Sequence, residues 1–206
     1  MRNERDKSIP TRQTLLGRLK RWDDQASWRD FFETYWRLIY AAAIKSGLND
    51  AEAQDVVQET VIAVAKKIET FRYDPAVDSF KGWLLYLTRK RIALQYRRRE
   101  RDRGGPQLDS ETKRTPVEMP DSAGINLDEI WDEEWKRNLW DVAIANAKRQ
   151  TSPKQFQLFD LYVIKERPAL EVARALGVTV AQVYLAKHRI SALVKAELDR
   201  LKNQLI

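Results

Sequence analysis

The chain has 206 residues, 43% of them hydrophobic, which is enough for one domain or two small domains with real cores. It contains no cysteine, so disulfides and thiolate metal sites are excluded, and neither an N-terminal secretory signal nor an apolar run of membrane length is recognisable. The formal net charge of +7 favours a polyanionic partner, and we expect a cytoplasmic protein without membrane insertion.

Helical spacing of apolar residues marks the first part of the chain. A short helix is predicted over residues 11–20, followed by a longer, aromatic-rich helix that ends at Gly47. The spacing of the longer helix predicts an inward row of Trp28, Phe32, Tyr35, Ile39 and Ala42. Asn49 and Glu52 form a capping-box pair at the start of a third helix. Its inward row is Val57, Val61, Val64, Ile68 and Phe71.

The opposite face of this third helix carries an isoleucine among polar residues. Its residues are Asp55, Gln58, Glu59 and Ile62. A solvated helix face with one exposed isoleucine explains the pattern, because single exposed apolar residues are common. A docking face for a partner protein explains it as well, since such faces surround an apolar residue with polar ones.

A loop over residues 71–79 leads into a helix over residues 80–103 with two apolar stripes. Between residues 89 and 103 this helix carries eight basic residues against two acidic ones. A core helix that ends in a solvated charge run fits the pattern, since cations suit the negative end of the helix dipole. A cationic, aromatic-bearing surface for nucleic acid fits it too.

Residues 104–127 contain three prolines and three glycines without periodicity, and we predict a flexible linker there. Helical patterns resume after it, and no segment has strand periodicity. The predicted class is therefore all-α, with two small helical domains over residues 11–103 and 128–206.

Residues 169–188 fit a helix-turn-helix. Ala173 lets two helices approach, Gly177 supplies the turn, and Val183 packs the second helix on the first. The second helix can then enter a DNA major groove with its outward side chains. These are Gln182, Tyr184, Leu185, Lys187, His188 and Arg189. The single histidine, His188, has no partner at metal-ligand spacing, so we expect neither a metal nor another cofactor.

Three segments in order resemble the extracytoplasmic-function (ECF) sigma factors of bacterial RNA polymerase, which belong to the sigma-70 family. They are DAEAQDVVQETVIAVAKKIETF, FKGWLLYLTRKRIALQYRRR and ALEVARALGVTVAQVYLAKHRISALV. The first is similar to the family's acidic D-x-x-Q-E segment, the second to its F-(R/K)-x-W-L segment, and the third to its second-domain signature.

The resemblance implies the following roles. Asp55, Gln58, Glu59 and Ile62 dock on the clamp of the polymerase's largest subunit. The melted minus-ten strand contacts Arg72, Tyr73, Lys90, Arg91, Arg97 and Arg98. The minus-thirty-five element contacts Gln182, Tyr184, Lys187, His188 and Arg189. The second domain rests on the polymerase flap, and the resemblance suggests an anti-sigma factor as a further partner.

Four positions depart from the family pattern. Lys90 stands where many relatives have asparagine, and Gln95 where aspartate is common, while Tyr184 and Leu185 replace a frequent Arg/Lys-Ser pair. The promoter sequence therefore cannot be inferred from the family.

Two alternatives belong to other classes of protein. A helix-turn-helix regulator with an N-terminal sensing or dimerisation domain explains residues 128–206 equally well, but not the basic helix 80–103. A nucleic-acid enzyme using Asp55 and Glu59 with a divalent metal lacks further converging acids. We therefore expect a protein that is not an enzyme.

Overall fold

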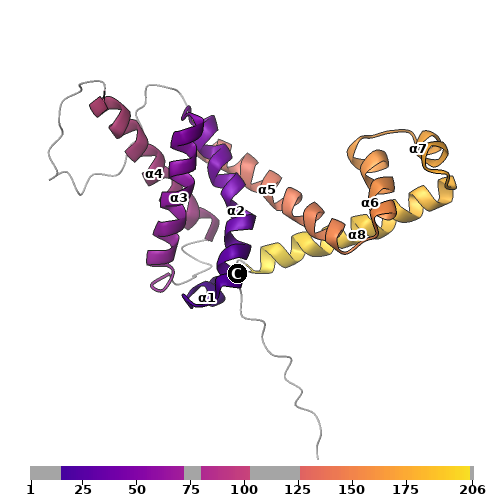
Figure 1. The fold of residues 1–206 in the computed structure, drawn as a ribbon, viewed down its shortest axis with the longest axis horizontal. Coiled ribbons are helices and arrows are strands. Elements are labelled where there is room, and N and C mark those ends of the chain that lie inside the picture. The colour runs from indigo at the N-terminus through magenta and orange to yellow at the C-terminus, as the bar shows by residue number, and fades with distance from the viewer. Residues whose placement is uncertain (1–14, 72–79, 103–125, 205–206) are drawn as a thin grey trace, which may run out of the picture.

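The computed structural model of the chain describes residues 15–71, 80–102 and 126–204, and every regular element within these ranges is a helix (Figure 1). The predicted all-α class is confirmed. Arg72, Tyr73 and the predicted linker up to residue 125 lie outside the described residues. The elements in chain order are α1 (Leu15–Leu19), α2 (Gln25–Lys45), α3 (Asp50–Lys67), α4 (Phe80–Asp102), α5 (Leu127–Arg149), α6 (Pro153–Phe159), the π-helix η2 (Asp160–Ile164), α7 (Ala169–Leu176) and α8 (Val180–Gln204).

Several helix boundaries follow capping residues. The Asn49 side chain accepts a hydrogen bond from the Glu52 backbone N–H at 3.0 Å, and the Glu52 carboxylate accepts one from the Asn49 N–H at 2.8 Å. The predicted capping box of α3 is thereby confirmed. Ser152 caps α6, whose first turn contains Pro153. Gly177 ends α7 in the left-handed region, at φ +60°.

Helices α1 to α4 share an aromatic core. Phe31, Tyr35 and Phe80 are buried, and their ring centroids lie 5.2 to 6.4 Å apart. The predicted inward row of α3 faces this core, because Val64 and Ile68 are fully buried. These contacts hold α3 and α4 beside each other.

The inward row predicted for α2 is wrong at one position, Phe32. Phe31 is buried, whereas Phe32 is 44% exposed and stacks on Trp36 with the ring centroids 6.2 Å apart. The physical reason is that α2 is covered on two sides, by α3 and by α5. Its buried arc is therefore wider than a single helical stripe and includes Phe31, Tyr35 and Leu38.

Helix α5 connects the two ends of the molecule. Its first half lies against α2 and α4, and its second half lies alongside α8, which runs back toward α1 (Figure 1). Trp131 is fully buried, and Trp135 stacks on Tyr35 with the ring centroids 5.8 Å apart. The main hydrophobic core thus continues from α1–α5 into α8, and the division of the chain into two domains remains a prediction.

A second, smaller core lies at the end of α8 farthest from α1–α4 (Figure 1). Its buried members are Leu158, Val172, Ala173, Val183 and Ala186. Here α7 and α8 meet at an angle of 105° around Gly177. Among the described helices, none alone has the length and apolar composition to cross a membrane, although the bent pair α7–α8 passes that test when taken together.

Candidate functional site

The four predicted docking residues lie together on the outer side of α3. Asp55, Gln58 and Ile62 are exposed, with 46% of Ile62 accessible, and Glu59 is half-buried. They recur at helical spacing because the opposite side of α3 is committed to the core through Val57 and Val64. We name this set, Asp55, Gln58, Glu59 and Ile62, the α3 face.

The α3 face touches the basic helix α4 directly. Arg98 Nη2 lies 2.9 Å from Glu59 Oε1, and the Gln95 amide donates to Asp55 Oδ2 at 3.5 Å. The α3 face and the basic residues of α4, which were predicted as two separate sites, therefore lie on one surface formed by adjacent helices. Because Arg98 already pairs with Glu59, this arginine is less available to a phosphate than the sequence suggests.

An exposed stripe on α4 gathers an aromatic ring and two cations. Tyr86, Lys90 and Arg97 recur at i, i+4 and i+11, which places them on one side of the helix. Tyr86 is 48% exposed, and Lys90 Nζ lies 4.5 Å from its ring centroid. We name these three residues the α4 stripe.

Tyr86 escaped the sequence-based prediction, although its spacing to Lys90 contains the necessary signal. The hydrogen bond to Lys90, together with the charges of Lys90 and Lys67, lowers the pKa of the Tyr86 hydroxyl. Lys67 ends α3, so cations from both helices surround this exposed ring. An exposed ring among cations is suited to stack a base while the cations hold its phosphates.

Two further basic residues of α4, Arg91 and Arg99, point inward or have a structural partner. Arg91 is half-buried, and its Nε is buried without a hydrogen-bond partner among the described residues. Arg99 forms a bidentate pair with Glu52 and donates to the Gly47 carbonyl at 3.1 Å. The Glu52 carboxylate thereby raises the pKa of the Arg99 guanidinium. Arg99 fixes the end of α4 to the turn between α2 and α3.

The predicted DNA-reading residues lie on the first three turns of α8, and all five are exposed. Gln182 Oε1 accepts a hydrogen bond from the Thr179 N–H at 2.9 Å. The side-chain carbonyl of Gln182 therefore caps the start of α8 and is already engaged within the protein. Tyr184 and Lys187 both contact the Tyr162 ring, at 5.6 Å each. Arg189 instead lines a hollow of about 320 Å³ between α6 and α8.

His188 is exposed on α8 between these two sets of contacts. Within the described ranges, no three His, Cys, Asp or Glu side chains gather closely enough to hold a metal ion.

Residues 31–102, which include most of α2 and all of α3 and α4, match the family described as sigma-70 region 2. The matched helices are those that carry the α3 face and the α4 stripe. This match identifies residues 31–102 as similar to region 2 of the sigma-70 family.

Solved structures that are similar to the chain include two complexes. The structure of CnrH in complex with the cytosolic domain of CnrY has 18% identity and a TM-score of 0.34, and the match covers 90% of this chain and 96% of that one. The structure of the RsbN–BldN complex has 15% identity and a TM-score of 0.32, covering 84% of this chain and 92% of that one. No curated protein matches the chain. The similarity of residues 31–102 to a known family rests on the region 2 match.

Proposed function

We propose that the chain is a sigma factor of the ECF type, which binds core RNA polymerase, recognises promoter DNA and assists its melting. The observation that carries this proposal is the region 2 match, because it spans the helices that present the α3 face and the α4 stripe side by side. The protein acts in the cytoplasm as a binding protein rather than as an enzyme, and an anti-sigma factor is a further proposed partner.

The α3 face docks on the clamp of the polymerase's largest subunit. The carboxylates of Asp55 and Glu59, the second of which is paired with Arg98, suit a cationic partner, and Ile62 supplies an exposed apolar contact at the C-terminal end of the face. Charged groups of this kind steer association, whereas the apolar residue contributes most once water is excluded.

The melted minus-ten strand binds along α4. Tyr86 stacks a base, and Lys90 and Arg97 hold the flanking phosphates. Arg91 and Arg98 remain proposed contacts that need their side chains to rearrange. Arg72 and Tyr73, from the preceding segment, complete the proposed set.

The minus-thirty-five element binds as duplex to the helix-turn-helix formed by α7 and α8. Their angle of 105° lies within the usual range for this motif, about 90–120°. We propose base or phosphate contacts for Gln182, Tyr184, Lys187, His188 and Arg189, all exposed on α8. The same part of the chain rests on the polymerase flap.

Reconstitution with core RNA polymerase tests the proposal. We expect a stable complex and promoter-dependent transcription. Asp55→Arg should abolish the complex, whereas Glu133→Arg, the same charge reversal at an exposed position of α5, should leave it intact. Circular dichroism checks that both variants keep the helical fold. Duplex DNA binding by the wild-type chain without polymerase association would favour the helix-turn-helix regulator instead.

A further inference from the structure

Two cations at the edge of α4 are held by carboxylates of α5. Lys81 Nζ lies 2.6 Å from Asp132 Oδ1, and Arg89 Nη2 lies 2.7 Å from Asp128 Oδ2. The two residues of each pair are far apart in the chain but close in the fold, because the first half of α5 packs against α2 and α4. Of the eight basic residues in the described part of α4, these are the two that α5 engages.

These ion pairs are not needed to hold the fold. Both carboxylates are more than half exposed, and exposed pairs of this kind contribute little stability. A carboxylate and a phosphate are recognised by the same Lys and Arg geometry, however, so each pair fills a place that a phosphate can take. The α5 acids therefore occupy one side of α4, where Arg89 directly precedes Lys90 of the α4 stripe.

The contact between α5 and α2 contains both stabilising apolar burial and destabilising buried polar groups. Trp131 and Trp135 bury apolar surface against the main core, which favours the packed arrangement. Trp131 Nε1, however, is buried without a hydrogen-bond partner among the described residues, and the nearly buried Glu134 depends on Lys45 at 2.7 Å. Buried polar groups of this kind weaken an interface relative to a purely apolar one.

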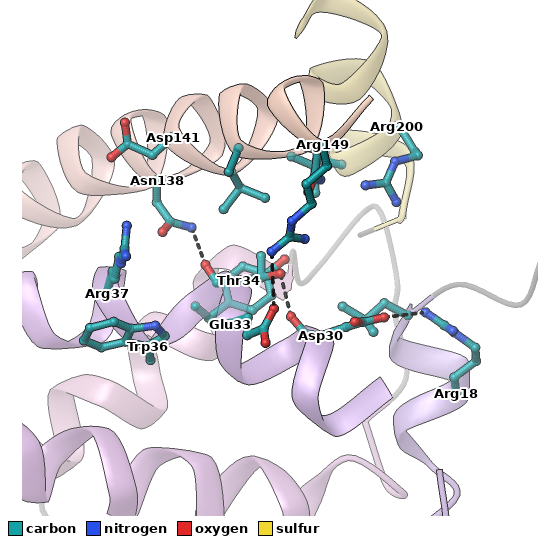
Figure 2. A pocket seen from close by; sticks show the side chains of 16 residues that line it. Arg18, Asp30, Glu33, Thr34, Trp36, Arg37, Asn138, Asp141, Arg149 and Arg200 are labelled. Carbon is teal, nitrogen blue, oxygen red and sulfur yellow. Dashed lines mark hydrogen bonds and ion pairs between the residues drawn. The ribbon is translucent and has the colours of Figure 1, made fainter. Parts of the chain in front are cut away.

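The other side of the same contact is open and polar. A cavity of about 370 Å³ separates α2 from α5 and α8, and charged side chains line it (Figure 2). Two contacts among the described residues cross this cavity from α5 to α2. Arg149 Nη2 lies 3.8 Å from Glu33 Oε2, which is long for an ion pair, and the Asn138 amide donates one hydrogen bond to the Thr34 carbonyl at 2.8 Å. An interface with water-accessible, charged space along one side can open at modest cost.

We propose that Lys81 and Arg89 are additional contacts for the single-stranded nucleic acid, and that α5 covers them until it moves aside. The Asp128 and Asp132 carboxylates stand in for phosphates and must leave before the strand can use the whole edge of α4. This inference rests on the proposed strand-binding role of α4. It adds two contacts to that role and makes them conditional on the position of α5.

Neutralising the covering carboxylates in the full chain tests the inference without polymerase. Asp128→Asn with Asp132→Asn should tighten binding of a fluorescein-labelled, mixed-sequence DNA single strand several-fold, measured by anisotropy. The matched control is Glu129→Gln with Glu133→Gln, an equal charge change at exposed positions of α5. The first pair should also steepen the dependence of log K on log salt by about 0.7 for each further phosphate that the protein neutralises, and the control should not.

Adding Lys81→Ala and Arg89→Ala to the first pair should remove the gain in affinity and in salt dependence. Equal tightening by both neutral pairs would mean a bulk charge effect and would overturn the inference. Circular dichroism spectra that match the wild type confirm that all variants are folded.

A covalent lock tests the movement of α5 itself. Because the chain has no cysteine, Lys45→Cys with Glu134→Cys introduces only two thiols, at an α2–α5 contact away from the proposed strand. Joined by a short bismaleimide, this variant should bind core polymerase but not open promoter DNA, whereas the unjoined variant should do both. Promoter opening by the joined variant would overturn the inference and leave the proposed function standing. If neither the joined nor the unjoined variant binds polymerase, the proposed function is refuted instead. The single-strand measurement would still decide the role of Lys81 and Arg89.

Discussion

Gly47 lies in the turn between α2 and α3 with φ at +87°, a conformation that residues with a Cβ rarely adopt. A Cβ at this position would also lie 2.9 Å from the Tyr96 hydroxyl, which donates to the Ser46 carbonyl. Gly177 has a similar backbone conformation, at φ +60°, but its added Cβ would meet no atom within 4 Å. An alanine at Gly177 would therefore meet backbone strain alone, whereas an alanine at Gly47 would meet both backbone strain and a steric contact.

We expect Gly47→Ala to lower the free energy of unfolding by about 1–3 kcal/mol, and Gly177→Ala by less. Urea unfolding followed by circular dichroism measures both. Equal losses would show that the Tyr96 hydroxyl gives way without cost and that only the backbone conformation matters.

Tyr86 is the residue of the α4 stripe on which base stacking depends in our proposal. Tyr86→Ala should weaken binding of a labelled DNA single strand by about 1–3 kcal/mol, the usual contribution of one stacked base. Tyr86→Phe should keep most of the affinity at neutral pH, because its ring stacks equally well. Trp22→Ala removes an aromatic ring that is 59% exposed elsewhere and serves as the control. A loss of the same size in Trp22→Ala would contradict the assignment of Tyr86.

The pH dependence follows from the same residue. Because Lys90 lowers the pKa of Tyr86, its hydroxyl loses the proton at a lower pH than an ordinary tyrosine. The phenolate is negative and repels phosphates, so strand affinity should fall as the pH rises through this lowered pKa. Tyr86→Phe has no titrating hydroxyl and should lose this part of the alkaline dependence. An unchanged profile in Tyr86→Phe would assign the dependence to another group.

At the scale of helices, the exposed side of α8 carries two sets of side chains. Tyr184 and Lys187 contact the ring of Tyr162 in η2, whereas Arg189 lines the hollow between α6 and α8. Arg189, unlike Lys187, does not lie over the Tyr162 ring, and we expect its guanidinium to reach a base edge. Arg189→Ala should cost about 1–3 kcal/mol of affinity for the cognate promoter duplex and relax specificity at one base pair.

The control for this helix is Lys195→Ala, an exposed cation farther along α8. It should weaken binding less, and equally for all sequences, because it lies beyond the first turns that enter the groove. Electrophoretic mobility shifts with holoenzyme on promoter variants measure both changes. Identical losses on cognate and altered promoters in Arg189→Ala would exclude base reading by this side chain.

Local signals in the sequence predicted the helices well, because they depend on neighbouring residues. Asn49 with Glu52 marked the start of α3, and Gly177 marked the end of α7. The partners of individual side chains were not predictable in the same way. The Arg98–Glu59 pair and the burial of Phe31 in place of Phe32 depend on how helices pack, which periodicity within one helix does not contain.

Across the whole molecule, the position of α5 was the least predictable feature. Its acidic first turn is a good helix start by itself, and nothing in that stretch specifies α2 and α4 as its neighbours. The contact joins residues on both sides of the predicted linker, so one core runs from α1 to the last turns of α8. Helical spacing could group the residues proposed as the site on α3 and α4, whereas the packing of α5 against α4 could not be predicted.

The sizes of the two cores predict how the molecule opens. The main core joins α1–α5 to α8, whereas the smaller core has only five buried side chains around the eight-residue α7. A helix this short is not stable by itself in water and depends on that packing. Local opening of α7 should therefore cost less free energy than global unfolding, and its amides should exchange hydrogen faster than those of α3.

Two matched core variants test this difference. Val183→Ala removes the same two methyl groups from the smaller core as Val64→Ala does from the main core, and both valines are fully buried. Hydrogen exchange measured by mass spectrometry should show faster exchange of α7 and the start of α8 in Val183→Ala, with α3 unchanged. Val64→Ala should speed exchange in α2, α3 and α4. Equal acceleration across the chain in both variants would mean that the two cores unfold as one unit, in which case α7 and α8 could not respond to DNA independently of region 2.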